Sequence, residues 1–317
     1  MIRNIGHLRQ LQSLPLEQKI ILTEMRIKQW YSHFKGNVYV SFSGGKDSTV
    51  LLDICRKIYP NVPSVFFDTG LEYPEIRDFV KTKDNIVWIK PDRNFKEIII
   101  NEGYPVVSKE VSQTIREAKL YDGEKYSYRI RKLEGEGCKY NFNKYKYLLD
   151  APFSISEKCC YYMKKKPAFK YERESGNYPI TGMMAEESLL RRTSWLMNGC
   201  NAYDGKRKLS NPMAFWTEQD VLKYIYINKL PIASIYGEVV YEGVEDLFGE
   251  FRIKYKLTGL KRTGCMFCMF GLPFEEYPNR FQRMKKTHPK QYDYCMKPIE
   301  DGGLGLDEVL TFMKIHH

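Results

Sequence analysis

The sequence has no long apolar run. Its 317 residues contain no stretch of about 18 consecutive apolar side chains, which excludes an ordinary transmembrane helix. The first twenty residues also lack the apolar segment of a secretion signal, so we expect a cytoplasmic protein with no membrane partner. Internal repeats and low-complexity tracts are missing too. Because 43% of the residues are hydrophobic and 14% aromatic, global disorder is excluded and a folded core is expected.

Acidic residues are comparatively scarce. The chain has 39 Asp and Glu against 50 Lys and Arg, which gives a formal net charge of +11. Cationic groups that neutralise phosphates release condensed counterions, so an excess of this size favours polyanionic partners. Both a nucleic acid and a phosphate-rich nucleotide would satisfy this charge.

Short apolar segments alternate with helical patterns along much of the chain. Apolar runs at 38–42, 64–67, 86–89 and 178–184 are typical of buried strands. Apolar residues at helical spacing mark 16–34, 49–59, 73–83, 187–197 and 217–227. This alternation predicts an α/β fold with a doubly wound parallel sheet. Right-handed crossovers would bring the loops at 43–48 and 68–72 to the rim formed by the C-terminal ends of the strands.

A glycine turn joins the first expected strand to its helix. It lies within the segment Ser41–Ser48, which reads Ser-Phe-Ser-Gly-Gly-Lys-Asp-Ser. Glycines allow the backbone to approach an anion, and the start of a helix offers unpaired N–H groups to it. Lys46 adds a positive charge, whereas Asp47 is better suited to holding Mg²⁺ or polar groups of the loop. The segment is not a Walker A loop, which requires glycine at position 40 and Ser or Thr at position 47.

Ser-Gly-Gly-Lys-Asp-Ser after a strand resembles the PP-loop of the ATP pyrophosphatases, also called adenine nucleotide alpha hydrolases. Three further segments resemble the phosphoadenosine phosphosulfate (PAPS) reductase-like branch of that superfamily: 68–74 (Asp-Thr-Gly-Leu-Glu-Tyr-Pro), 182–192 and 212–221. This resemblance implies a loop that binds the pyrophosphate part of ATP, or the equivalent groups of a sulfonucleotide. It also implies a Rossmann-like fold.

Transferred by motif, the resemblance implies Lys46 and Asp47 as catalytic residues. The nucleotide-binding residues that it implies are Ser41, Ser43, Gly44, Gly45, Lys46, Asp47, Ser48, Asp68, Thr69, Gly70, Glu187 and Arg191. Some of these have a structural alternative. Asp68 is also a reasonable strand-end cap, and Glu187 with Arg191 has the spacing of an ion pair on a helix surface.

Eight cysteines occur in a chain without an export signal, which favours metal binding or catalysis over disulfides. Cys159 and Cys160 are adjacent, and Cys265 and Cys268 form a C-x-x-C pair. Adjacent cysteines chelate one tetrahedral zinc poorly but can each bind a different iron. The order of the four resembles the [4Fe-4S] signature of adenylyl-sulfate (APS) reductases. Zinc and incidental thiols are the alternatives, and core or surface thiols are expected at Cys55, Cys138, Cys200 and Cys295.

APS and PAPS reductases carry a nucleophilic cysteine in a Glu-Cys-Gly-Leu-His type tail. The sequence around Cys295 (Tyr-Cys-Met-Lys) does not match that tail, and this speaks against sulfonucleotide reduction. Between Arg116 and Arg173, cations alternate with tyrosines. Such a stretch suits contact with phosphates and bases, and it equally suits a solvated insertion packed on the sheet.

Together these features predict three regions. They are an N-terminal helical segment (1–35), a PP-loop nucleotide-binding domain (36–230) with a basic insertion at about 110–170, and a C-terminal region (231–317) that completes the cysteine set. The last region is expected to be aromatic and loop-rich from Tyr236 onward. The predicted function is ATP cleavage to AMP and pyrophosphate for sulfur transfer, with Mg²⁺, a [4Fe-4S] cluster, a tRNA or DNA acceptor and a sulfur donor protein. A sulfonucleotide reductase and a non-catalytic nucleotide- or nucleic-acid-binding subunit are the alternatives.

Overall fold

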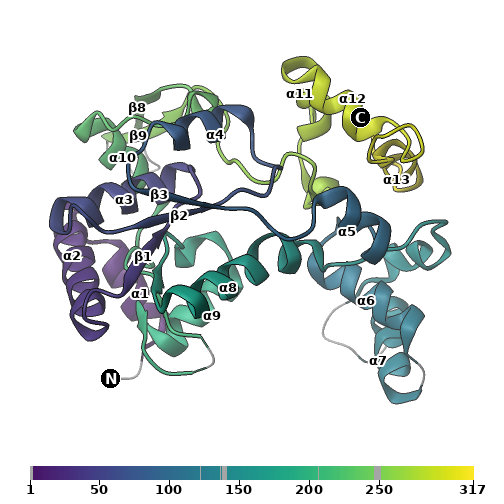
Figure 1. Ribbon diagram of the computed structural model, residues 1–317, viewed down its shortest axis with the longest axis horizontal. Helices are drawn as coiled ribbons and strands as arrows, with labels where there is room; N and C mark the ends of the chain where they lie inside the picture. Colours follow the sequence, from purple (N-terminus) through teal and green to yellow (C-terminus); the bar gives the residue numbers. More distant parts are fainter. Residues whose placement is uncertain (1–2, 122, 136, 138–140, 206, 246–250) are drawn as a thin grey trace. The chain divides into compact units, whose positions relative to one another are not determined.

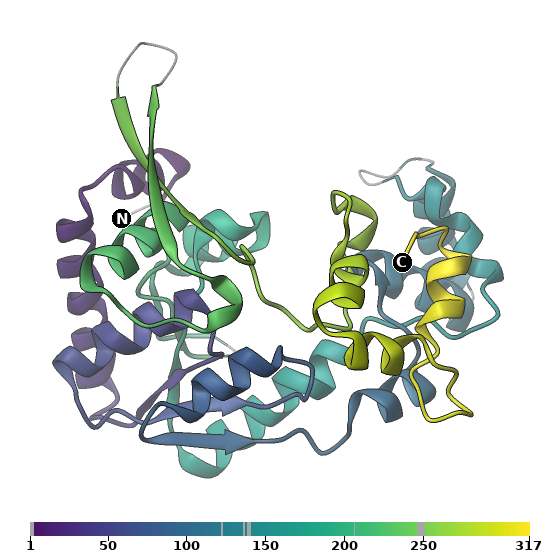
Figure 2. The ribbon, with the colours of Figure 1, turned by 90° about the horizontal axis from the view of Figure 1, so that it is seen from above.

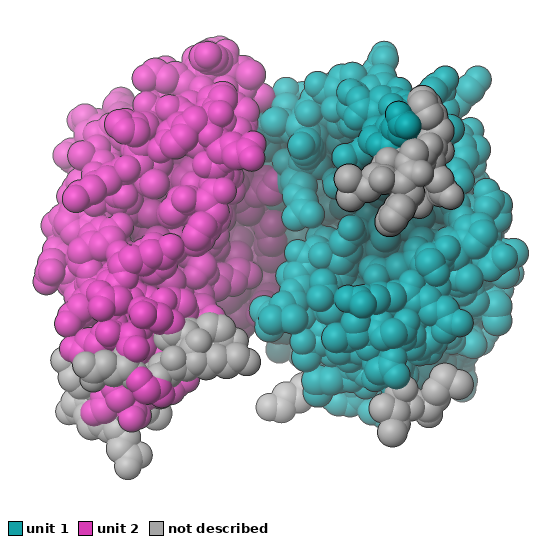
Figure 3. All heavy atoms as spheres, turned by 180° about the vertical axis from the view of Figure 1, so that it is seen from behind, with its two compact units in different colours: residues 1–68, 72–90, 167–263 teal, residues 69–71, 91–166, 264–317 magenta. Residues whose placement is uncertain are grey.

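The structure is a computed structural model, and it describes residues 3–121, 123–135, 137, 141–205, 207–245 and 251–317. The chain forms two compact units, coloured separately in Figure 3. Unit 1 comprises residues 1–68, 72–90 and 167–263, and unit 2 comprises residues 69–71, 91–166 and 264–317. Each unit therefore combines segments that are far apart in the sequence.

Unit 1 is built on one sheet. Its strands are β1 (Val38–Ser41), β2 (Ser64–Phe67), β3 (Ile86–Ile89), β5 (Tyr178–Ile180), β6 (Asn201–Ala202) and β7 (Leu209–Ser210). They are arranged in the order β3-β2-β1-β5-β7-β6, and Figure 1 labels β1, β2 and β3 of this sheet. All neighbours from β3 to β7 are parallel, and β6 pairs antiparallel with β7 at the edge. The predicted α/β class with a parallel sheet is confirmed.

Each of the five helical ranges predicted from apolar periodicity contains a helix of unit 1, with shifts at its ends, whereas the helices at 5–12 and 166–175 were not predicted from it. The helices of unit 1 are α1 (Ile5–Gln12), α2 (Leu16–His33), α3 (Lys46–Ile58), α4 (Pro74–Lys81), α8 (Lys166–Ser175), α9 (Leu189–Asn198), α10 (Glu218–Asn228) and the short turns η3 (Ala185–Glu187) and η4 (Ser234–Tyr236). α3 begins three residues before the expected position 49. Its first turn is polar, so apolar periodicity alone does not detect it. Nowhere in the described ranges is a helix both long and apolar enough to cross a bilayer.

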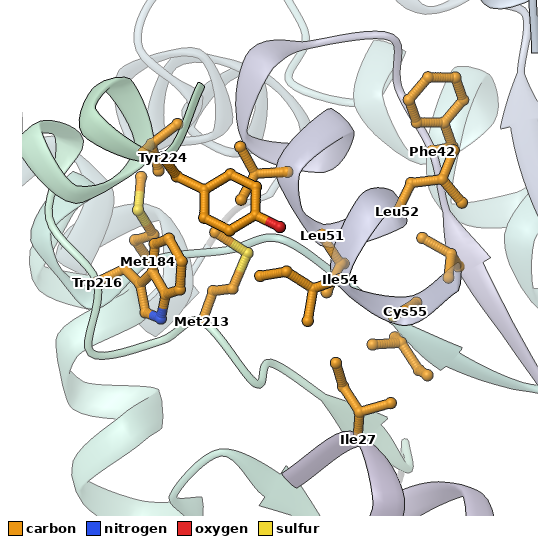
Figure 4. Packing of buried hydrophobic residues seen from close by; sticks show 14 of the residues in the cluster. Ile27, Phe42, Leu51, Leu52, Ile54, Cys55, Met184, Met213, Trp216 and Tyr224 are labelled. Carbon is orange, nitrogen blue, oxygen red and sulfur yellow. The ribbon is translucent and has the colours of Figure 1, made fainter. Parts of the chain in front are cut away.

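Side chains of β1 are buried on both faces of the sheet. Val38 and Val40 belong to the main apolar cluster, to which α2 and α3 also contribute. Tyr39 points to the opposite face, because side chains alternate along a strand. There its hydroxyl lies 3.0 Å from Glu172 Oε1 and its ring contacts that of Tyr171, both on α8. Figure 4 shows the main cluster, where α3 side chains meet those of the segment that leads into α10.

A buried polar contact ties α2 to the start of α10. Lys19 Nζ lies 2.6 Å from Asp220 Oδ2, and the Lys19 side chain is only 2% exposed. The same carboxylate oxygen accepts a 2.7 Å hydrogen bond from the Thr217 backbone N–H, completing a capping box at the helix start. Close by, Trp216 Nε1 donates to Thr23 Oγ1 over 2.8 Å. α2 therefore fixes the position of the first turn of α10.

Unit 2 is mostly helical. It contains α5 (Phe95–Glu102), α6 (Lys109–Leu120), α7 (Gly123–Glu134), η1 (Asn143–Asp150), the π-helix η2 (Tyr161–Lys165), η5 (Leu272–Phe274), α11 (Arg280–Thr287), α12 (Pro289–Met296) and α13 (Leu306–Phe312). β4 (Val106–Val107) and β10 (Met269–Phe270) form a short parallel pair. This pair joins the insertion to the chain that follows the C-x-x-C motif.

The C-terminal region has more regular structure than expected. The prediction of a loop-rich segment after residue 236 is wrong, because that segment contains the hairpin of β8 (Val239–Glu245) and β9 (Phe251–Leu257) as well as α11, α12 and α13. The two strands of the hairpin are the long green arrows at the upper left of Figure 2. The boundaries expected at residues 35 and 230 both fall inside unit 1, so the compact units divide the chain differently. The three-region division stays a prediction.

Candidate functional site

The loop between β1 and α3 carries the expected PP-loop residues. Gly45 is the N-cap of α3, has an extended backbone and provides no side-chain cap. Gly44 has a φ of +72°, which favours glycine. A Cβ at Gly44 would also come within 2.8 Å of methyl groups of Ile76 and Val80 on α4. The loop is therefore packed closely against α4.

The two serines of the loop hold it together internally. Ser48 Oγ accepts a hydrogen bond from the Ser43 backbone N–H at 3.2 Å and donates to the Gly45 carbonyl at 2.9 Å. The Ser43 and Ser48 hydroxyls lie 3.1 Å apart. Ser43 also lines the adjoining cavity, whereas Ser48 is buried beneath the loop. Ser48 therefore shapes the cradle in this arrangement, and Ser41 lies at the end of β1.

Lys46 is a buried cation held between carboxylates. Its side chain is 4% exposed, with Nζ 3.2 Å from Asp47 Oδ1 and 3.5 Å from Glu218 Oε1. Burial raises the pKa of Asp47, Lys46 lowers it, and the negative charges of Glu187 and Glu218 raise it further. Asp47 Oδ1 is buried and, despite its proximity to Lys46, has no hydrogen-bond partner among the described residues. This corner of the loop carries more negative than positive charge.

A cavity of about 180 Å³ opens above these groups. Its lining within unit 1 consists of Ser43, Gly45, Lys46, Asp47, Met184, Glu186, Glu187, Glu218, Tyr236, Arg262 and Thr263. Four carboxylates and two cations therefore surround one small space. Four of the predicted nucleotide-binding residues of the loop line it, together with Glu187.

The sequence reasoning missed one wall of the cavity. The Tyr236 hydroxyl lies 3.4 Å from the Lys46 backbone nitrogen and contacts Thr263 Oγ1 at 2.5 Å. Burial raises the pKa of Tyr236 to about 12, so its hydroxyl is protonated at neutral pH. Arg262 and Thr263 come just before the first cysteine of the C-x-x-C motif. Two features of the sequence could have pointed to this wall. They are the polar pair Arg262-Thr263 just before the C-x-x-C motif and Glu218 at the recognisable start of a helix.

Residues predicted from the other motifs have local partners. Asp68 is buried and forms a 2.9 Å ion pair with Arg77 of α4. Thr69 Oγ1 accepts from the Leu71 N–H at 3.2 Å, and Gly70 adopts a φ of +73°. Arg191 forms an i,i+4 ion pair with Glu187. Neither Asp68 nor Arg191 lines the cavity. Their nucleotide-binding role stays a prediction.

The four motif cysteines are neighbours within unit 2. Cys159 Sγ and Cys160 Sγ are 4.0 Å apart, and no disulfide joins the described cysteines. The pKa of Cys159 is raised by its hydrogen bond to Cys160, by burial and by the charges of Cys160, Cys268 and Cys265. Burial and the charge of Cys265 likewise raise the pKa of Cys268 to about 11. In the described part of the chain, no three His, Cys, Asp or Glu side chains are arranged to hold a metal ion. Cys138 lies outside the described residues.

Positive charge collects near the cysteine pair. The hydrogen bond from Cys159 lowers the pKa of Cys160 to about 5, and the cations Lys109 and Lys164 contribute in the same direction. One thiol of the pair is therefore readily ionised, as a metal ligand must be. The π-helix η2 starts immediately after Cys160.

Many cations of the basic insertion are used internally. Arg116 pairs with Glu157 at 2.8 Å and Lys132 with Glu110 at 3.0 Å. Tyr145 is buried. These residues are packed within unit 2, which differs from the alternative of an insertion packed on the sheet, because the sheet belongs to unit 1. The expectation of nucleic-acid contact across this stretch stays a prediction.

The chain matches the family model of the phosphoadenosine phosphosulfate reductase domain over residues 37–116 and 107–271. It therefore belongs to the phosphoadenosine phosphosulfate reductase domain family. It is 26% identical to an uncharacterized protein of Methanocaldococcus jannaschii over 90% of this chain, and it spans about half (53%) of that relative's length. It is 24% identical to an adenosine 5'-phosphosulfate reductase of Staphylococcus epidermidis, covering 67% of this chain and 70% of the relative.

A further relative is subunit 2 of a sulfate adenylyltransferase of Geotalea uraniireducens, which is 22% identical over 82% of both chains. Among solved structures, the chain is similar to the phosphoadenylyl-sulfate reductase of Candida auris in its phosphate complex, with a TM-score of 0.38 and 17% identity. That match covers 78% of this chain and 98% of the other.

Proposed function

We propose that the cavity above the PP-loop binds Mg·ATP and that the chain cleaves it between the α and β phosphates. The observation that carries this proposal is the buried Lys46 at the start of α3, where no N-cap side chain closes the helix and where residues of the PP-loop line a cavity. Helix N-termini and lysine are a recurrent combination for phosphate binding. ATP therefore fits the loop better than a neutral ligand does.

Magnesium belongs to this proposal because of the carboxylates. A polyphosphate entering a cavity with four carboxylates and two cations meets a negative surface. A divalent cation bound to the phosphates would remove that repulsion, and carboxylate oxygens are the ligands it prefers. Asp47 and Glu218 are the residues that would hold it, since both already lie beside Lys46. When bound, the ion would neutralise charge on the phosphates.

In the proposed reaction an acceptor oxygen attacks the α-phosphorus, and the bond from that phosphorus to the bridging oxygen breaks. The electron pair leaves with pyrophosphate. Lys46 and the amides at the start of α3 would stabilise that departing charge. Tyr236 keeps its proton and would donate a hydrogen bond at the cavity wall. Sulfur from a donor would then displace AMP from the activated acceptor, for which we propose a nucleic acid.

Cys159, Cys160, Cys265 and Cys268 are the proposed ligands of a [4Fe-4S] cluster. A four-iron cluster takes one thiolate for each iron, so its ligands need not converge on a single point. The mutual influence of the four thiols and the cations beside Cys160 support this assignment. The cluster would supply the sulfur or electron chemistry of the second step.

Sulfonucleotide reduction is the second candidate, because curated relatives bear that name. It requires a cysteine that can reach the sulfur of the nucleotide. Cys295 is fully buried in α12, and burial raises its pKa well above the ordinary thiol value. Such a thiol is a poor nucleophile, which favours the adenylating reaction.

The proposal is tested by incubating the chain with Mg·ATP, sulfide and RNA or DNA acceptors. We expect AMP and pyrophosphate from the wild type and their loss in Lys46→Met. Lys57→Met is the matched control, because Lys57 lies on the same helix but is half exposed and pairs with Asp53. A binding subunit would release no pyrophosphate with any acceptor. Sulfite release from APS or PAPS that disappears in Cys295→Ser would favour the reductase.

A further inference from the structure

Two aromatic side chains of unit 2 are unusually exposed. Phe274, at the end of η5, is 65% exposed, and Tyr277, three residues later, is 62% exposed. Large aromatic rings are normally buried, and rings that stay in water often serve as contact surfaces. Lys144 Nζ lies 5.2 Å from the centre of the Phe274 ring. The segment therefore presents two rings with a cation beside one of them.

The backbone that carries these rings is held in place from both sides. Arg283 Nη1 donates a hydrogen bond to the Pro278 carbonyl. Asn279 caps α11 and forms a capping box with Gln282. The Asn279 Nδ2 group also donates to the His316 carbonyl at 2.7 Å. The backbone next to the rings is therefore fixed by hydrogen bonds, which lowers the conformational entropy that is lost when a ligand binds.

A cavity of about 490 Å³ adjoins Tyr277. Its lining is formed by Tyr277, Pro278, Gln282, Lys285, Lys286 and His317. Among the residues that the structure describes, Lys286 forms no ion pair, and Lys285 only packs over the ring of Tyr292 at 5.0 Å. No Asp or Glu side chain belongs to this lining. This distinguishes it from the PP-loop cavity and makes it attractive to an anion.

Nearby acids are largely compensated. Glu275 pairs with Arg280 and, at 3.4 Å, with Arg283. His317 Nε2 lies 2.8 Å from Asp307 Oδ1. Glu276 is exposed between the two rings and is the local negative charge that a polyanion would meet. The charge on the cavity side is therefore carried by Lys285 and Lys286.

We propose that Phe274, Tyr277, Lys285 and Lys286 form a binding site for single-stranded nucleic acid. Rings stack on bases of any sequence, and lysines follow the backbone phosphates. The open cavity beside Tyr277, together with the second exposed ring of Phe274 three residues earlier in the sequence, suits consecutive nucleotides better than an isolated one. Only the idea that this strand is the sulfur acceptor rests on the proposed function. Binding at this site stands by itself.

The test is fluorescence anisotropy of the full chain with labelled twelve-nucleotide single-stranded DNA and RNA. We expect Tyr277→Ala to weaken binding about 10- to 100-fold and Tyr277→Phe to retain it, because stacking needs the ring and not the hydroxyl. Lys285→Gln with Lys286→Gln should weaken binding and flatten its salt dependence. Glu276→Gln should strengthen it.

The matched control is Lys290→Gln with Lys297→Gln, two exposed lysines that do not line the cavity. Equal affinity of the Lys285/Lys286 and control variants, or of wild type and Tyr277→Ala, would refute the site. Competition by AMP as strong as that by the oligonucleotide would show a mononucleotide pocket and would also overturn the proposal. Lys46→Met should bind the oligonucleotide normally, so loss of pyrophosphate release alone leaves this site intact.

Discussion

The packing of the PP-loop makes one residue unusually informative. Gly44 has a φ of +72°, and a Cβ there would lie 2.8 Å from methyl groups of Ile76 and Val80. Gly176 has a φ of +70°, belongs to the same unit and would have nothing within 4 Å of its Cβ. The substitutions Gly44→Ala and Gly176→Ala therefore both place an alanine in the left-handed backbone region. Only Gly44→Ala also brings the new methyl group too close to α4.

The shared cost is left-handed backbone strain, which is about 1–2 kcal/mol for an alanine. Gly44→Ala adds overpacking against α4, which costs about 1–3 kcal/mol more. We therefore expect Gly176→Ala to lower the free energy of unfolding by about 1–2 kcal/mol and Gly44→Ala by about 2–5 kcal/mol. The loss of unfolding free energy in Gly176→Ala measures the backbone strain alone. The additional loss in Gly44→Ala measures the steric contact between the PP-loop and α4.

Urea titration followed by tryptophan fluorescence is the suitable assay. All four tryptophans lie in unit 1, so the signal reports that unit: Trp30, Trp88, Trp195 and Trp216. With an m value of about 2 kcal/mol/M, the extra loss moves the midpoint by about 0.5–1.5 M. Equal midpoints for the two variants would refute the reasoning that α4 supports the loop.

Three further predictions concern other groups. Lys19→Met should cost about 3–5 kcal/mol, because it leaves the Asp220 carboxylate without its buried cation; wild-type stability in urea would contradict this. Burial raises the pKa of Asp47, so without Mg²⁺ unit 1 should lose stability as pH rises from about 4 toward that raised pKa. Asp47→Asn should remove this loss, and an identical dependence of stability on pH in wild type and Asp47→Asn would disprove the prediction. Anaerobic purification should give about four irons per chain, lost in Cys159→Ser and kept in Cys200→Ser; a colourless wild-type protein would exclude the cluster.

Four strands of the sheet, β1, β2, β3 and β5, were predictable because their segments are short and apolar, whereas the two-residue strands β6 and β7 were not predicted. Runs such as Ser64–Phe67 and Ile86–Ile89 agree with the expected ranges at both ends. The PP-loop was predictable because its residues are contiguous, so local chemistry alone identifies them. Neither inference needed information about distant parts of the chain.

The cavity wall and the C-terminal fold were not predictable in the same way. Tyr236 contacts Lys46 from a position about 190 residues later, and Thr263 contacts Tyr236 in turn, so only tertiary packing brings these residues together. β9 does alternate strictly between apolar and cationic residues over 251–257, and this strand signal was overlooked in the sequence. The short helices α11, α12 and α13 offer too few turns for a clear pattern.

The central claim is that the loop after β1 holds the phosphates of ATP. Titration calorimetry of Mg·ATP into the full chain tests it most directly. We expect one site per chain, with affinity about 10- to 150-fold weaker in Lys46→Met and unchanged in Lys57→Met, since a charged contact is worth about 1.5–3 kcal/mol. The absence of binding heat from the wild type, or equal affinity in Lys46→Met, would contradict it.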